Sequence, residues 1–237
     1  MKVGTAVGYA VMGLGALVPE VRAAIYVNGR STSAYTSSGA DSSAANYWRV
    51  TDNVIVLRNK GPYLIHGSGT MPIQCASTVD YANVTFSNLT VTAKDEDYGA
   101  FDCGTKKTVH LTLKGTNALT STAYSAKIHR PGLAVLSGST LFITNTFRSA
   151  KLTCTGAEKA AGIGGGYKQG VLSDSDNDAG TIHIYGGTIV AKGGASGAGI
   201  GGGSGNGGSG KNITITGGTV TAVATNWGAG IGGGGWS

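Results

Sequence analysis

The string Ala-Gly-Ile-Gly-Gly-Gly occurs three times in the last third of the chain. Its copies begin at Ala161, Ala198 and Ala229, and their isoleucines are 37 and 31 residues apart. Repeats of about 20 to 50 residues are typical of solenoids, in which each repeat forms one turn and stacks on the next. None of the copies ends in the Gly-Lys-Ser/Thr of a phosphate-binding loop. The repetition therefore favours a solenoid, and we expect no nucleotide site.

The segments between the glycines are typical of β-strands. They are rich in Val, Ile and Thr, and apolar residues alternate with polar ones, as in "NITITGGTVTAV". Aligned on their apolar residues, six segments repeat at intervals of 25 to 41 residues: Val54/Val56, Val84/Phe86, Val109/Leu111, Leu141/Ile143, Ile182/Ile184 and Ile213/Ile215. A coil of short strands suits this spacing better than a sandwich does. The isoleucine of each glycine string would then point inward and stack in a column along the coil.

The N-terminus has the pattern of a secretory signal peptide. Lys2 precedes an apolar run from Ala6 to Val18, and Pro19 ends that run. The alternative is a retained membrane anchor, but the run is shorter than the roughly 20 residues that span a bilayer. We expect residues 1–23 to be removed, leaving a domain of residues 24–237 that is secreted or displayed at the cell surface.

Together these features resemble the glycine-rich, right-handed parallel β-helix repeats of secreted and surface-attached bacterial proteins, often labelled carbohydrate-binding. The resemblance runs from Tyr47 to the last residue and is carried by "GGTVTA" at Gly217, "GAGIGGG" at Gly197 and "VHLTLKGTNALTS" at Val109. It implies an all-β coil of six to seven rungs, polysaccharide binding or adhesion, and calcium as a cofactor. The same fold hosts pectate-lyase-like enzymes, so the fold alone does not decide the function.

Two acidic segments interrupt the repeat. Asp174, Asp176 and Asp178 alternate in "DSDNDAG", as oxygen ligands of calcium do, although no Glu completes an EF-hand loop. A solvated acidic turn is the alternative. The second segment contains Asp95, Glu96, Asp97 and Asp102. The resemblance to lyases implies a carboxylate-bound calcium with Lys94 or Arg130 as the base.

Aromatic rings are the candidate sugar-binding groups, because a flat ring stacks on the apolar face of a pyranose. We expect Tyr167, Trp227, Tyr98 and Tyr185 to serve in this way, with Tyr167 and Trp227 beside glycine strings that leave a ring little to pack against. His110 and His183 share an outward position with Phe142 and Thr214. No histidine has metal-site spacing, and these two are predicted to be surface residues.

The three cysteines leave at least one thiol without an intramolecular partner. Cys75 and Cys103 would form a disulfide if they stack on adjacent rungs and a corner absorbs three residues. Free thiols are the alternative. Cys154 is predicted to be a buried packing residue.

The function predicted from the sequence is non-catalytic polysaccharide binding or adhesion outside the cell. A fibre-forming structural protein is the first alternative, because the chain ends at "GIGGGGWS" with no polar cap, and the open last rung could bind a second copy. A calcium-dependent polysaccharide lyase is the second. The net charge of +6 is scattered along the chain, so no nucleic-acid partner is expected.

Overall fold

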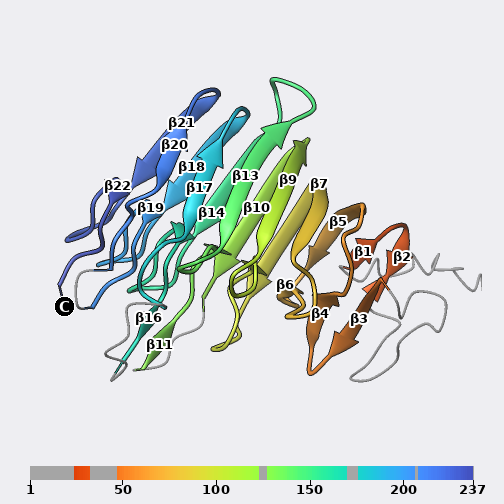
Figure 1. Ribbon diagram of the computed structural model, residues 1–237, viewed down its shortest axis with the longest axis horizontal. Helices are drawn as coiled ribbons and strands as arrows, with labels where there is room; N and C mark the ends of the chain where they lie inside the picture. Colours follow the sequence, from red (N-terminus) through yellow and green to blue (C-terminus); the bar gives the residue numbers. More distant parts are fainter. Residues whose placement is uncertain (1–23, 33–46, 123–126, 170–175, 206–207, 237) are drawn as a thin grey trace, which may run out of the picture.

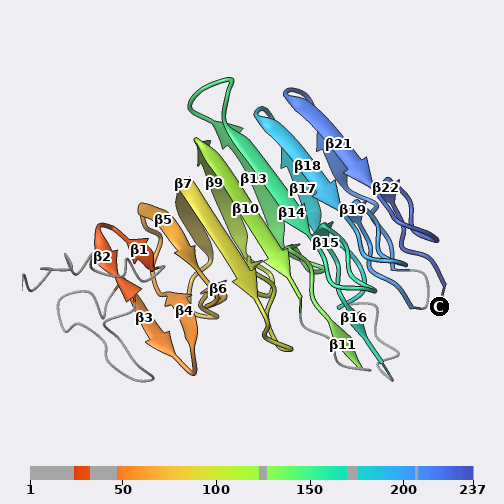
Figure 2. The ribbon, with the colours of Figure 1, turned by 180° about the vertical axis from the view of Figure 1, so that it is seen from behind.

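The computed structural model describes residues 24–32, 47–122, 127–169, 176–205 and 208–236. The regular elements in these ranges are β-strands, which Figures 1 and 2 show stacked side by side along the long axis of the molecule. In the same ranges there is no helix long and apolar enough to cross a membrane. The predicted signal peptide lies outside the described residues.

The chain coils so that its strands form three faces, and within each face the strands of successive turns run parallel to one another. The first face contains β9 (Thr108–Lys114), β13 (Thr140–Asn145), β17 (Thr181–Ile184) and β20 (Ile213–Ile215). The second contains β10 (Thr116–Ser121), β14 (Lys151–Thr155), β18 (Thr188–Lys192) and β21 (Thr219–Val223). The third contains β4 (Val54–Leu57), β6 (Ile73–Cys75), β8 (Phe101–Asp102), β12 (Leu133–Ala134), β15 (Ile163–Gly164), β19 (Ile200–Gly201) and β22 (Ile231–Gly232).

In the early rungs, two longer strands run across both the first and the second face. β5 (Tyr63–Gly69) pairs with β7 (Tyr81–Ala93), and β7 pairs with β9 through its first half and with β10 through its second. With seven strands stacked on the third face, one for each turn, the chain makes the predicted six to seven rungs. The architecture is a parallel β-helix, which confirms the predicted fold class.

The isoleucine of each glycine string points into the core. Ile163 pairs with Ile200, and Ile200 pairs with Ile231, on consecutive rungs of the third face. The same column continues toward the N-terminus through Leu133, Phe101, Ile73 and Ile55, and all of these except the terminal Ile231 are fully buried. The predicted inward column is therefore confirmed.

The predicted register is confirmed for four of the six aligned segments and wrong for two. Val109/Leu111, Leu141/Ile143, Ile182/Ile184 and Ile213/Ile215 pair in order on the first face. In β7, however, Ala82 and Val84 occupy these positions, so the predicted pair Val84/Phe86 is two residues out. Val54/Val56 belongs to the third face. Because strand side chains alternate with a period of two, a shift of two leaves the apolar pattern unchanged.

The N-terminal end of the coil is covered by antiparallel strands. β1 (Ile25–Val27) pairs with β5 and with β2 (Arg30–Ser31), while β3 (Trp48–Thr51) pairs with β4. Ile25, Val27, Trp48 and Val50 are buried in the core of the first rungs. These antiparallel strands form hydrogen bonds with β4 and β5, the first strands of the coil, and so cover the strand edges at this end.

Glycine is required where consecutive third-face strands approach closely. Gly164 and Gly201 have φ values of 132° and 138°, and a Cβ on Gly201 would lie 1.9 Å from the carbonyl oxygen of Gly232. Gly232 has nearly the same φ, 134°, but belongs to the last rung, where the nearest atom to its Cβ would be the Ala229 Cβ at 3.5 Å. The two glycines differ mainly in whether another rung lies against them.

We predict that Gly201→Ala destabilises the protein far more than Gly232→Ala does. Both substitutions strain a positive φ that is essentially restricted to glycine, at a cost of about 1–3 kcal/mol, but only the first also forces two backbones apart. The measurement is the free energy of unfolding from denaturant titrations, at a protein concentration low enough to avoid association. Equal losses for the two variants would show that rung contact is not the reason for glycine.

Candidate functional site

A ladder of stacked rings lies on the outer side of the first face. His110, Phe142 and His183 are paired positions of β9, β13 and β17, as predicted, and Thr214 follows on β20. The ring centroids of His110 and Phe142 are 4.9 Å apart and those of Phe142 and His183 are 4.8 Å apart, with interplanar angles of 14° and 9°. The rungs thus hold the three rings nearly parallel along the coil.

Tyr185 extends this ladder toward the edge of the face. Its ring lies 6.2 Å from both Phe142 and His183 and is within 9° of parallel to each. The side chain is 48% exposed, and it directly follows the last residue of β17. One flat ring face is therefore held in a fixed orientation at the surface, as stacking on a sugar requires.

Beside Tyr185, the corner between the first and second faces is hollowed into a pocket of about 430 Å³. The Gly-Gly pairs at residues 186–187 and 217–218 form the turns at this corner, so no side chains fill it. The preceding rung turns by a longer loop, residues 146–150, which rises above the others in Figure 1. The difference in turn length between rungs creates the pocket.

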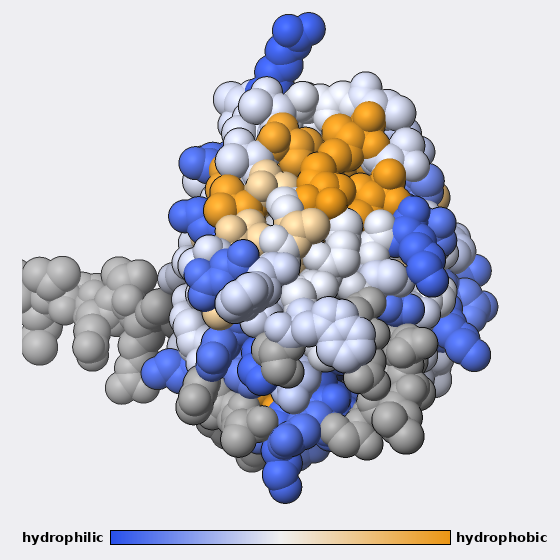
Figure 3. All heavy atoms as spheres, turned by 90° about the vertical axis from the view of Figure 1, so that its left-hand side faces the viewer, coloured by the Kyte–Doolittle hydropathy of each residue, from blue (hydrophilic) through white to orange (hydrophobic). Residues whose placement is uncertain are grey.

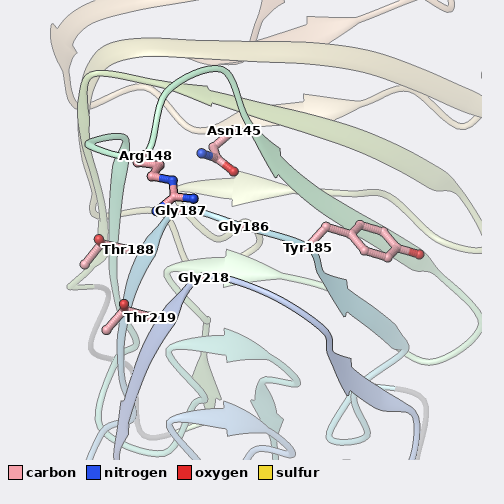
Figure 4. Close-up of a pocket in the computed structure, with 8 residues that line it drawn as sticks. All are labelled: Asn145, Arg148, Tyr185, Gly186, Gly187, Thr188, Gly218 and Thr219. Atoms are coloured by element: carbon pink, nitrogen blue, oxygen red, sulfur yellow. The ribbon is translucent and has the colours of Figure 1, made fainter.

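The polar lining of this corner pocket comes from two sides. Asn145, the last residue of β13, and Arg148, in the longer loop, line one side, while Thr188 and Thr219 stack on consecutive rungs of the second face (Figure 4). Asn145 lies over Gly186, where a Cβ would be only 1.9 Å from its Oδ1, and its Nδ2 donates to the carbonyl oxygen of Phe147 at 2.8 Å. Among the described residues that line the pocket, Arg148 is the only charged one, and it is exposed.

The lining residues Asn145, Arg148, Thr188 and Thr219 are absent from the sequence-based prediction. The segment "NTFRSA" at residues 145–150 stands where the later repeats have a Gly-Gly turn. That contrast is visible in the sequence, but it shows only that one turn is longer. The direction of the loop depends on the rungs below it.

Tyr167 is not the exposed ring that its position beside a glycine string predicted. It is only 9% exposed, because β16 (Tyr167–Lys168) pairs with β11 (Ile128–His129) and the ring packs against His129. The Lys159 Nζ lies 4.7 Å from its ring centroid. A second chain segment thus covers the ring, which the local sequence does not reveal.

Trp227 and Tyr98 lie apart from the corner pocket. Trp227 is exposed on the last rung. Tyr98 lines a second pocket, of about 540 Å³, together with Arg49, Arg58, Asp95 and Asp97. Burial, reinforced by the nearby carboxylates of Asp97, Asp102 and Asp95, raises the pKa of the Tyr98 hydroxyl. The four rings predicted to bind sugar therefore do not form one site.

The aspartates proposed as calcium ligands are only partly described. Asp174 lies outside the described residues. Asp178 accepts hydrogen bonds from the backbone N and the Oγ of Ser209, at 2.5 and 2.9 Å, and so anchors the next rung. The described residues contain no group of three metal-ligating side chains. Calcium at Asp174, Asp176 and Asp178 stays a prediction.

The two residues that the lyase resemblance implied as bases differ in their surroundings. Lys94 is exposed, whereas Arg130 is buried and its Nε donates to the Glu96 carbonyl oxygen at 3.0 Å. Asp95 is occupied locally, since its Oδ1 accepts from the backbone N of Asp97 and of Tyr98. Asp102 is buried, and desolvation raises the pKa of its carboxyl group despite the nearby Gly104 N–H and Arg130.

Cys75 and Cys103 follow paired residues of β6 and β8, so they stack on adjacent rungs, which was the condition set for a disulfide between them. The predicted disulfide is nevertheless absent, because both residues are buried free thiols. Burial raises the pKa of Cys75 to about 12 and that of Cys103 well above its usual value, and only a thiolate reacts readily. Cys154 is buried in the column of Ala191 and Ala222, as predicted.

Comparison with known proteins agrees with this architecture. A family model described as a beta helix repeat matches residues 182–204 and 213–235, which are two successive rungs. Searches of curated proteins and of solved structures gave no significant match. The match covers only these two rungs, and it agrees with the parallel β-helix fold of the described residues.

We predict that all three cysteines are unreactive in the native protein. At pH 8 a thiol reagent should label none of them within minutes, because burial keeps them protonated. After unfolding in denaturant without reductant, all three should be labelled. Labelling of one thiol only would reveal a disulfide, and rapid labelling before unfolding would show that the core is open.

Proposed function

We propose that this parallel β-helix repeat protein is a non-catalytic polysaccharide-binding protein of the cell exterior. In this proposal a glycan lies over the corner pocket, with one sugar ring against Tyr185. The observation that carries it is the exposed Tyr185 ring, aligned with the rings of Phe142 and His183 beside a polar pocket.

The chemistry of the pocket suits a sugar. A pyranose presents C–H groups on one face and hydroxyls around its rim, so it needs a flat apolar platform beside hydrogen-bonding groups. Tyr185 supplies the platform, and Asn145, Thr188 and Thr219 supply the hydrogen-bonding groups. Rungs repeat at about 4.8 Å, comparable to the length of one sugar residue, so successive rungs can contact successive sugars.

The charge of the pocket favours an acidic polysaccharide. Arg148 is exposed, and a guanidinium binds carboxylate or sulfate groups through paired hydrogen bonds. The described residues that line this pocket include no carboxylate that would compete for the guanidinium. The proposed ligand is therefore a polymer with uronic acid or sulfated sugars. Calcium belongs to the proposal as a bridging ion and is tested as a separate variable.

A polysaccharide array, run once with calcium and once with chelator, tests this function. We predict that the wild-type chain binds acidic polysaccharides and that Tyr185→Ala weakens binding about tenfold, the equivalent of about 1.4 kcal/mol. Arg148→Ala should weaken binding to acidic polymers while changing neutral ones little. These two effects separate ring stacking from charge recognition.

Tyr81→Ala is the matched control, because Tyr81 is an exposed tyrosine of β7 on the first face but outside the corner pocket. It should bind like the wild type. The absence of binding to any polysaccharide under either condition would overturn the proposal. Binding that Tyr185→Ala and Arg148→Ala both leave unchanged would place the site elsewhere.

A further inference from the structure

The two ends of the coil present different surfaces. At the C-terminal end, apolar side chains of the last rung are exposed, as Figure 3 shows. At the N-terminal end, β1 and β3 cover the strand edges. Arg49 on β3 and the first strands of the third face line the second pocket, of about 540 Å³. We call it the charged pocket.

A tight hairpin fixes one side of the charged pocket. β3 and β4 are joined by Asp52 and Asn53, whose φ values of 49° and 62° are both positive, as in the two-residue turns that suit paired strands. The hairpin places Arg49 opposite Val56, and Val56 pairs with Gln74 of β6, so these three residues form a row across the sheet. Asp52 also lines the pocket, about 10 Å along the strand from Arg49.

The two sides of the charged pocket carry opposite charges. Arg49 and Arg58 lie on the side formed by β3 and β4. Asp95, Asp97 and Tyr98 come from the connection between β7 and β8, and β8 is two strands farther along the third face than β4. A positive side and a negative side therefore face the same space.

Charges from the two sides are available to a ligand. Within the part of the chain that the structure describes, neither the Arg49 nor the Asp97 side chain has a hydrogen bond or ion pair, and both side chains are exposed. Asp95 Oδ1 accepts from the backbone N of Asp97 and of Tyr98, which holds the acidic segment in a fixed turn. A molecule that carries both charges fits between the two sides.

The potential at Tyr98 favours a cation. Besides burial, the carboxylates of Asp97, Asp102 and Asp95 raise the pKa of the Tyr98 hydroxyl, because they oppose a further negative charge there. The same carboxylates attract a positive group, and an aromatic ring face adds to that attraction. This side of the pocket therefore suits an ammonium group.

We infer that the charged pocket binds a short peptide through its free N-terminal ammonium and its free C-terminal carboxylate. The ammonium group lies at Asp95 and Asp97, against the ring of Tyr98. The carboxylate lies at Arg49 and Arg58, because a guanidinium binds a carboxylate through paired hydrogen bonds.

The remaining lining suits the middle of a peptide. Gln74 has a side-chain amide that both donates and accepts hydrogen bonds, as a peptide group requires. Val54, Val56 and Ala76 offer apolar surface to small side chains. The volume lies in the usual range for small-ligand sites, roughly 300–1,000 Å³. An acidic polysaccharide would be repelled by the carboxylates here, so this site is separate from the corner pocket.

Isothermal titration calorimetry with trialanine tests this inference. The peptide is used in three forms: with both termini free, with the N-terminus acetylated, and with the C-terminus amidated. The free form should bind. Each blocked form should bind about tenfold more weakly or worse, because it loses one charge-assisted interaction.

Two variants that remove a charge assign the ends of the peptide. Arg49→Gln should weaken binding of the free peptide about tenfold and change binding of the amidated form little. Asp97→Asn should do the same for the free and the acetylated forms. Both side chains are exposed, so the variants should fold, and circular dichroism checks this.

Glu96→Gln is the matched control, because Glu96 is exposed in the same acidic segment but does not line the charged pocket. It should bind the free peptide like the wild type. No heat of binding with free trialanine at its highest soluble concentration would overturn the inference, and so would equal binding of the three forms. The polysaccharide array uses another ligand and another pocket, so either result can fail without the other.

Discussion

The structure depends on the backbone ladder between consecutive rungs. Each strand of a face bonds to the strand one turn away, and this fixes which residue lies above which throughout the coil. The ladder forces like positions to coincide, so apolar residues with a period of two generate continuous columns such as Ile163, Ile200 and Ile231. Burial of those columns supplies the hydrophobic stabilisation that short isolated strands lack.

The same constraint explains why the candidate site lies at a corner. On the faces, register leaves little room for variation, and the outward residues form ladders such as His110, Phe142 and His183. At the corner between the first and second faces no ladder is required, and turn length varies from a Gly-Gly pair to the loop that contains Arg148. The faces therefore align Tyr185, and the variable turns surround it with polar groups.

The sequence predicts the repeating part of this molecule well and the exceptions poorly. The third-face column, the first-face pairs from Val109 to Ile215 and the outward ring ladder are all set by spacing, which the ladder preserves. Tyr167 was misjudged because β11, about 40 residues away, covers it. The misplaced Val84 shows that a period of two cannot distinguish a shift of two. Contacts between segments that do not repeat leave no such pattern.

Because each rung is covered by the rungs on either side of it, the burial of a repeated residue differs between the ends of the coil and its middle. Ile200 and Ile231 have the same sequence context and direction, yet one is buried and the other is nearly half exposed. The difference arises only from the presence or absence of a following rung. At the N-terminal end, β1 and β3 reverse direction and satisfy the edge.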